Sequence, residues 1–205
     1  VLFRSHEPSD FAVLNLFVLV VTLVATGIVK PAWSDFNDGA VAVEQGDYAK
    51  ALQEWTSVAV EGDVKAQYNL GVMHADGLGT QQNYTEAAKW YLLAAKQGYG
   101  AAQYNLGVLY QRGLGIPVST TSAIKWYRQA AENGVPEYLF SLALIYAQGE
   151  GVARNYVTAF MWLSLATIKG HPEASSFLKK LRQKMTAPQI SEGQQVANEW
   201  LTTRW

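Results

Sequence analysis

Three histidines are the residues best suited to metal binding or acid–base catalysis, and their spacing favours neither. His6, His74 and His171 lie far apart, and none has a second ligand at the spacing of a zinc site. His74 is followed at steps of 36 residues by Tyr110 and Tyr146, so we expect it to pack or to form a hydrogen bond. The chain has no cysteine, which excludes disulfides, thiolate metal sites and cysteine nucleophiles. We therefore expect no metal and no cofactor.

Glycine-rich turns and hydroxyl side chains are the remaining candidates for chemistry. Gly-x-Gly turns begin at Gly77, Gly113 and Gly149. A phosphate loop needs a preceding strand, and a Walker motif ends in Gly-Lys-Ser/Thr, and the sequence predicts neither. No serine stands in a Gly-x-Ser-x-Gly elbow, and the carboxylates are scattered over predicted solvated helix faces. We therefore expect a chain that is not an enzyme.

The composition is that of a folded chain without a strong charge. Of 205 residues, 49% are hydrophobic and 16% are charged, which excludes a disordered chain and allows one domain with a sizeable core. Lysine and arginine total 16 against 17 aspartates and glutamates, so the net charge is −1. Nucleic-acid binding needs a basic stripe, so we expect no DNA or RNA partner.

An uncharged apolar run, Phe11–Val29, dominates the N-terminal part. Ala32 and Ser34 follow it as the small residues of a cleavage site before Asp35, which predicts a secretory signal peptide over residues 1–34. The run is also long enough to span a bilayer, so an uncleaved anchor in the inner membrane is the alternative. Because the chain opens with VLFRS and lacks a positive leader region, we expect these first residues to be an assembly artefact.

A repeat of 36 residues organises the rest of the chain. Each unit predicts two helices, since apolar residues recur at helical spacing and glycines follow each helix. The small residues Gly71 and Ala87 allow the paired helices to approach closely. We expect Trp126 to be buried between units, so that Trp126→Ala costs roughly 3–5 kcal/mol. The residues in register are Trp90, Trp126 and Trp162; Gly98, Gly134 and Gly170; Ala87, Ala123 and Ala159; and Leu70, Leu106 and Leu142.

The pattern A-x-Y-x-L-G-x-x-Y-x-x-G-x-G, followed by A-x-x-W-Y-x-x-A-A-x-x-G, resembles the signature of the Sel-one-like repeat (SLR) family. This family is related to the tetratricopeptide repeat, and the likeness covers residues 35–201. The resemblance is to secreted bacterial members, and it implies an all-α, right-handed α-solenoid that binds other proteins. Hydrolase activity belongs to a cysteine-rich branch of the family, and this chain has no cysteine.

The predicted units are unequal. The first is shorter and tetratricopeptide-like, because Gly46–Tyr48 replaces the long Gly-x-Gly turn. The fourth is degenerate, since Tyr138 and Ala143 stand where units two and three have an alanine and a glycine. The last two predicted helices cap the stack. The predicted boundaries are 1–34 for the signal peptide, 35–63, 64–99, 100–135 and 136–171 for the four repeats, and 172–205 for the capping helices.

The first helix of each unit usually lines the concave face of a solenoid. The tetratricopeptide resemblance places three rows of groove residues around the Leu-Gly pair, and we call these rows together the repeat groove. An aromatic row is suited to anchor a peptide. The alternative is that it packs between first helices and only maintains the fold. The rows are Phe36, Tyr68, Tyr104 and Phe140; Val72, Val108 and Leu144; and the variable Asp76, Arg112 and Gln148.

The sequence thus predicts a non-catalytic adaptor or regulator that binds a protein or peptide through the repeat groove. We expect a periplasmic monomer that meets a membrane only through its signal or anchor segment. A membrane-anchored scaffold of the cell envelope is one alternative. A hydrolase-like SLR protein is another, which the missing cysteines and the missing base–nucleophile pair disfavour.

Overall fold

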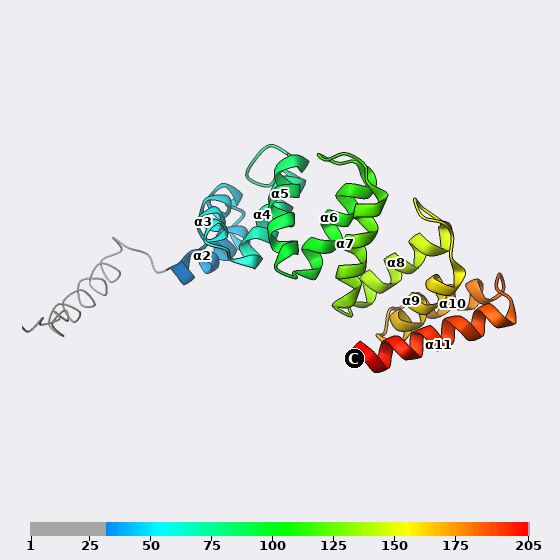
Figure 1. Ribbon diagram of the computed structural model, residues 1–205. Helices are drawn as coiled ribbons and strands as arrows, with labels where there is room; N and C mark the ends of the chain where they lie inside the picture. The colour runs from blue at the N-terminus through cyan, green and yellow to red at the C-terminus, as the bar shows by residue number, and fades with distance from the viewer. Residues whose placement is uncertain (1–31, 205) are drawn as a thin grey trace, which may run out of the picture.

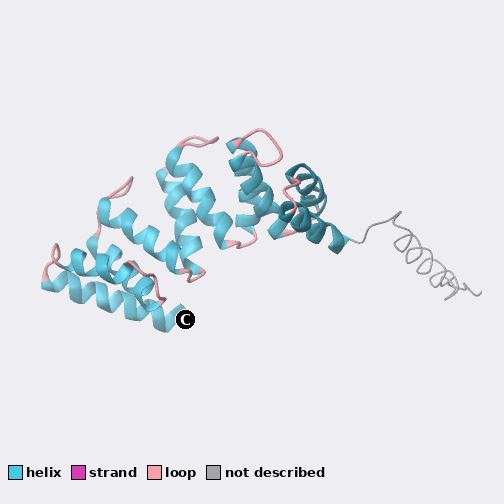
Figure 2. Cartoon of the chain, turned by 180° about the vertical axis from the view of Figure 1, so that it is seen from behind, coloured by secondary structure: helices cyan, strands magenta, loops and turns pink. Residues whose placement is uncertain are grey.

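The computed structural model describes residues 32–204, and all regular structure in that part is helical (Figures 1 and 2). The predicted signal segment Phe11–Val29 lies outside the described residues. Within residues 32–204, no helix combines the length and the apolar character that crossing a bilayer requires. The helices are α2 (Ala32–Glu44), α3 (Tyr48–Val60), α4 (Val64–Asp76), α5 (Tyr84–Lys96), α6 (Gly100–Arg112), α7 (Thr120–Glu132), α8 (Pro136–Gln148), α9 (Tyr156–Ile168), α10 (Ala174–Arg182) and α11 (Ala187–Arg204).

The helices stack in consecutive pairs. Helix α2 packs on α3, α4 on α5, α6 on α7 and α8 on α9, and the second helix of each pair contacts the first helix of the next. At the C-terminal end, both α10 and α11 pack on α9. Figure 1 shows the pairs following one another along an extended stack, from blue at α2 to red at α11. The predicted all-α solenoid is confirmed.

Side chains and glycines set where the helices begin and end. Asp63 and Asn83 cap α4 and α5, since their side chains accept backbone N–H groups of the first turn. Helices α4, α6 and α8 end at glycines with φ near +70°, a conformation that other residues adopt at a cost (Gly77 +73°, Gly113 +68°, Gly149 +76°). The first Gly-x-Gly glycine is therefore a helix stop.

The second glycine of each long turn permits contact between units. Gly79 also has a positive φ, of 69°, and a Cβ there would lie 2.5 Å from the backbone of Tyr48 in the preceding unit. A Cβ at Gly115 would collide with the backbone of Tyr84 in the same way, and the Thr85 hydroxyl donates to the Gly115 carbonyl at 3.0 Å. The Gly-x-Gly turns thus join successive units.

A glycine in the first helix lies against a tyrosine ring of the second helix. A Cβ at Gly107 would lie 2.7 Å from the Tyr127 ring, and a Cβ at Gly71 would collide with a ring in the same way. In unit four, Ala143 takes the glycine's position and Leu163 the tyrosine's, and both are buried. The degenerate unit four therefore carries a matched exchange, in which a smaller partner leaves room for the added methyl group.

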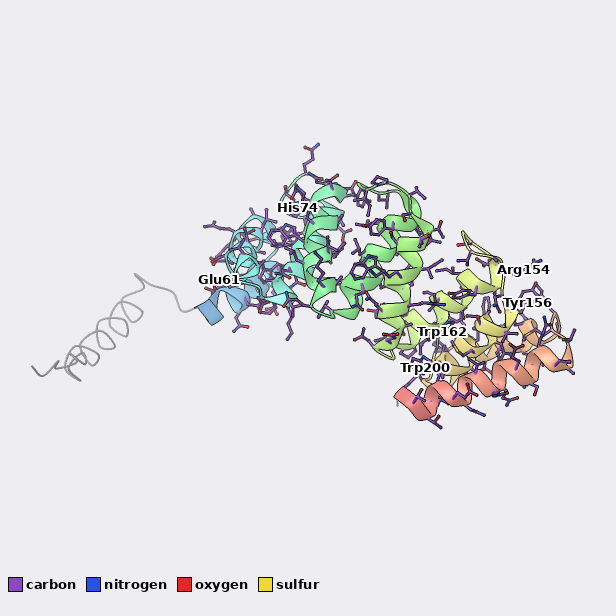
Figure 3. The ribbon with its side chains drawn as sticks, in the orientation of Figure 1. Glu61, His74, Arg154, Tyr156, Trp162 and Trp200 are labelled. Carbon is purple, nitrogen blue, oxygen red and sulfur yellow. The ribbon has the colours of Figure 1, made fainter. Side chains whose placement is uncertain are left out.

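The tryptophans lie between units, but their burial differs. Trp90 packs on the cluster formed by α2, α3 and α4. Trp162 is buried, and its ring meets Trp200 of α11 edge to face at 5.6 Å between centroids (Figure 3). Trp126, like Trp90, is only half-buried, and it packs on the cluster formed by α4, α5 and α6. The expectation that Trp126 is fully buried is wrong, so Trp126→Ala should cost less than 3 kcal/mol.

Candidate binding groove

The aromatic row of the repeat groove is half-buried between units. The Tyr104 ring centroid lies 5.4 Å from that of Tyr127 and 5.0 Å from that of Tyr138 in the next unit. Its hydroxyl is 3.4 Å from the Ser141 hydroxyl. Tyr138, which stands where other units have alanine, is thus a stacking partner for Tyr104.

The other rings of this row have similar partners. Tyr68 lies 5.0 Å from Tyr99, and Phe140 stacks on His171 at 4.0 Å, both between ring centroids. Tyr99 and His171 occupy the same position in the repeat, and Phe36 lies 6.0 Å from the ring of Trp55. These contacts give the aromatic row a packing role in the stack.

The other two rows differ in their exposure to solvent. Val72, Val108 and Leu144 are half-buried, whereas Asp76, Arg112 and Gln148 are exposed. Cavities bring these rows together: Asp76, Val108 and Arg112 line one, and Leu144 and Gln148 line another. Phe36 and Val72 line two further cavities, but Tyr68, Tyr104 and Phe140 line none of these four.

Three of these cavities occupy the same place in the repeat: between units one and two, between units two and three, and between unit four and α10. We call them the N-terminal, middle and C-terminal hollows, with volumes of about 210, 230 and 190 Å³. The lining residues of the middle hollow are Ala75, Asp76, Tyr84, Tyr91, Asn105, Val108, Leu109, Arg112 and Leu114. Their equivalents 72 residues later line the C-terminal hollow: Ala147, Gln148, Tyr156, Leu163, Phe177, Lys180, Leu181 and Lys184, with Leu144 added. Their equivalents 36 residues earlier line the N-terminal hollow: Tyr48, Trp55, Asn69, Val72, Met73 and Leu78, with Val43 added.

The sequence register of the residues that line the C-terminal hollow shows which position of the repeat α10 occupies. Ala174 and Leu178 continue the 36-residue step of Ala102 and Leu106 beyond unit four. Helix α10 therefore lies where the first helix of a further unit would lie. Because this segment was interpreted only as a cap, three lining residues of α10 and one in the turn that follows it were missed, although the 36-residue register could have revealed them. These residues are Phe177, Lys180, Leu181 and Lys184.

Hydrogen bonds cross the equivalent place between units three and four. Gln111 stands where Ala75 and Ala147 line the other hollows. Its side-chain oxygen accepts from the Tyr127 hydroxyl at 2.8 Å, and its nitrogen donates to Glu150 at 3.0 Å. The longer side chain thus takes up space that alanine leaves open, and it ties two units together.

The middle hollow is polar and of mixed charge. Asp76 and Arg112 are exposed, and Tyr91 is buried beneath them. Burial raises the pKa of Tyr91 well above its usual value, a hydrogen bond with Asn105 opposes this, and the charge of Asp76 adds to the rise. The hydroxyl therefore stays protonated and is available to donate a hydrogen bond.

The C-terminal hollow is apolar with a basic rim. Leu163 and Phe177 replace the tyrosine and asparagine of the middle hollow. The Lys180 ammonium lies 5.3 Å from the Phe177 ring centroid, a distance typical of a cation–π contact. Arg154 lies at 5.3 Å from the ring of Tyr156, which also lines the hollow (Figure 3).

His74 lies half-buried near the end of α4 (Figure 3). Its Nδ1 is buried without a hydrogen-bond partner among the described residues. Burial lowers the pKa of His74, and the nearby Glu86 partly opposes this shift. The predicted packing role fits this setting better than the predicted hydrogen bond. No cluster of three His, Asp or Glu side chains suited to a metal ion occurs in the described part of the chain.

Comparisons with known proteins follow the repeat closely. The family model of the Sel1 repeat matches residues 64–99, 100–135 and 136–171. The chain is similar to a Sel1 repeat protein from Oxalobacter formigenes of known crystal structure, with 31% identity and a TM-score of 0.65 over 70% of this chain and 59% of that one. A search of the curated proteins finds no match.

A second crystal structure shares the fold. It is that of c5321, a protective antigen present in uropathogenic Escherichia coli strains and displaying an SLR fold. The identity is 24% and the TM-score 0.57, over 85% of this chain and 46% of that chain. The chain therefore spans less than two thirds of either solved protein.

Proteins built from Sel1 repeats are generally scaffolds for protein interaction and are typically non-catalytic. The family model covers more than half of this chain, and the helical pairs and long turns have the geometry of such repeats. The chain belongs to the Sel1 repeat family.

Proposed function

We propose that this chain is a non-catalytic adaptor or regulator that binds a protein partner through the repeat groove and the hollows beside it. One observation carries the proposal: the same hollow recurs along the stack while its lining residues change. Asp76 and Arg112 give way to Gln148 and Lys184 at the equivalent positions. A surface with a fixed frame and variable side chains is suited to recognise one partner among many.

The size of the hollows indicates what each one receives. Pockets for drug-sized ligands hold roughly 300–1,000 Å³. The middle and C-terminal hollows hold about 230 and 190 Å³, which suits a single side chain. A partner that presents an extended segment places several side chains in successive hollows. We therefore propose that the partner contributes a peptide-like segment.

We propose that the chain acts as a monomer in the periplasm, and that an inner-membrane anchor facing the periplasm is the alternative. The proposal rests on the apolar run Phe11–Val29 and on the small residues Ala32 and Ser34. Mass spectrometry of the protein isolated from cells tests it. A chain that starts at Asp35 supports export with cleavage, and retention of residues 11–29 supports the anchor.

A crosslinking pull-down from the native envelope tests the binding role. The bait is the full chain, compared with Asp76→Ala/Arg112→Ala, in which both changed residues are exposed. Tyr104 is a poor choice for substitution because it packs on two rings. The matched control Lys96→Ala/Glu137→Ala also removes one acid and one base, at exposed positions that line none of the four cavities.

We expect the wild type and the control to recover the same partner, and the groove variant to recover at least about tenfold less, a loss of about 1.4 kcal/mol. Circular dichroism checks that both variants are folded. Equal recovery by a folded groove variant would contradict the proposal.

A further inference from the structure

The floor of the C-terminal hollow is apolar. Leu163 and Leu181 are 1% and 6% exposed, and Phe177 and Leu144 lie half-buried beside them. In the middle hollow the equivalent floor contains the Tyr91 hydroxyl and the Asn105 amide. A polar group that enters the C-terminal hollow finds no such partner in its floor and loses its hydration. An apolar side chain loses nothing there and gains the burial of its surface.

The rim of the same hollow is basic. Lys180 and Lys184 line it, are exposed, and stand four residues apart in sequence, Lys180 in α10 and Lys184 in the turn after it. The stretch 174–191 contains four lysine or arginine residues and no aspartate or glutamate, in a chain whose net charge is −1. Lys180 and Lys184 replace Val108 and Arg112 of the middle hollow. Charge complementarity therefore favours a ligand with carboxylates beside its apolar group.

The volume narrows the ligand further. A cavity of about 190 Å³ is smaller than the pockets that take drug-sized molecules. It suits one side chain of the size of leucine, methionine or phenylalanine. The flanking residues of a peptide then lie over the rim, where the two ammonium groups are.

We propose that the C-terminal hollow binds one large apolar side chain of an acidic peptide segment, whose flanking carboxylates contact Lys180 and Lys184. This inference rests on the proposed function, and it defines the chemistry of the partner at one end of the groove.

Fluorescence anisotropy on the full chain tests the inference with defined probes. The probe is a labelled 15-residue peptide with a central leucine between aspartates and glutamates. One control peptide has serine for the leucine, and a second has asparagine and glutamine for the acids. We expect the probe to bind at least tenfold more tightly than either control, and to weaken severalfold between about 50 and 200 mM salt.

Two variants locate the binding. Lys180→Glu/Lys184→Glu should weaken the probe at least tenfold, whereas Lys50→Glu/Lys96→Glu makes the same charge change at exposed positions away from the hollow and should act less than twofold. Ala147→Gln places in the hollow the residue that the repeat already carries at Gln111. It should remove the preference for leucine over serine. Circular dichroism checks that each variant is folded.

Three results would overturn the inference. In the first, the neutral peptide binds as well as the acidic one. In the second, the folded Lys180→Glu/Lys184→Glu variant binds the probe unchanged. In the third, the chain binds vesicles of phosphatidylglycerol and phosphatidylcholine through these lysines and binds no peptide. None of the three removes the proposed function, which fails separately if the Asp76→Ala/Arg112→Ala variant keeps its envelope partner.

Discussion

The middle and C-terminal hollows occupy the same position in the repeat, 72 residues apart, yet they differ in chemistry. The middle hollow has a tyrosine and an asparagine below a rim of opposite charges, Asp76 and Arg112. The C-terminal hollow has an apolar floor below two lysines. The difference teaches that the repeat fixes the position of each hollow, while the residues that vary between units fix its polarity and charge.

The frame of a hollow means here the buried leucine and the packed pair of rings beside it. This frame is similar at the two hollows. Leu109 and Leu181 are equivalent and are 4% and 6% exposed. Tyr68 packs on Tyr99 beside the middle hollow, and Phe140 packs on His171 beside the other. The exposed rim residues therefore differ between the two hollows while these packing contacts are kept.

The largest expected effects come from the shared frame. Leu109→Ala and Leu181→Ala should each lower the free energy of unfolding by about 3 kcal/mol, because each leaves a cavity at a buried position. Urea unfolding followed by circular dichroism measures both. A cost for Leu181→Ala below about one third of that for Leu109→Ala would show that α10 is not docked as a repeat helix.

A pair of substitutions gives unit two the residue types that unit four has where the first helix meets the second. Gly71→Ala should cost about 1–2 kcal/mol, because the added methyl group meets the Tyr91 ring. With Tyr91→Leu added, the pair matches Ala143 and Leu163 of unit four, so the double variant should cost at least about 1 kcal/mol less than the sum of the single variants. Additive costs in urea unfolding would contradict the matched exchange.

His74 should make the free energy of unfolding depend on pH. The pKa of His74 is lowered in the folded chain, so the unfolded chain binds more protons once the pH falls below about 6.5. The contribution of His74 is therefore complete above that pH and declines as the pH falls through the folded pKa. At the equivalent position in unit four the chain carries Tyr146 in place of a histidine.

The measurement is the urea midpoint at pH 7.5 and 5.5 for the wild type and for His74→Tyr, the residue found in units three and four. The wild type should lose more stability on acidification than the variant does. The same loss in both chains would show that His74 does not titrate in this way.

The smallest effects are expected at the rims. Asp76→Asn and Lys184→Gln should each change the free energy of unfolding by less than about 0.5 kcal/mol, because both side chains are exposed. Thermal unfolding checks this. A larger loss of stability at either position would mean that the rim residue also packs the units together. The rim residues would then not be free to vary.

The sequence predicts the solenoid because the residues that pack the helices together recur every 36 positions. Glycine, leucine and alanine recur wherever helices meet, so the helix pairs and the exposed row of Asp76, Arg112 and Gln148 follow from the period. It does not reveal the partners of the aromatic row, since Tyr104 finds Tyr138 only once units three and four are stacked.

The unit-like role of α10 was also missed, for a physical reason. Only the core positions Ala174, Leu178 and Leu181 keep the repeat pattern there. The exposed and half-buried lining positions carry Phe177, Lys180 and Lys184. The tryptophan and the Gly-x-Gly turn that mark units two to four are absent at the 36-residue step after Gly170. Exposed lining residues such as Lys180 and Lys184 are free to vary because the packing between units does not depend on them. For the same reason the sequence did not reveal the C-terminal hollow.

Site-specific photocrosslinking in cells that produce the protein tests most directly the central proposal that the repeat groove is the binding surface. A benzophenone amino acid replaces Arg112 or Gln148 in the groove, or exposed Lys96 on α5 as the control. The account predicts that both groove positions give an adduct with the same protein and that the control gives none. An adduct from Lys96, with none from Arg112 and Gln148, would contradict it.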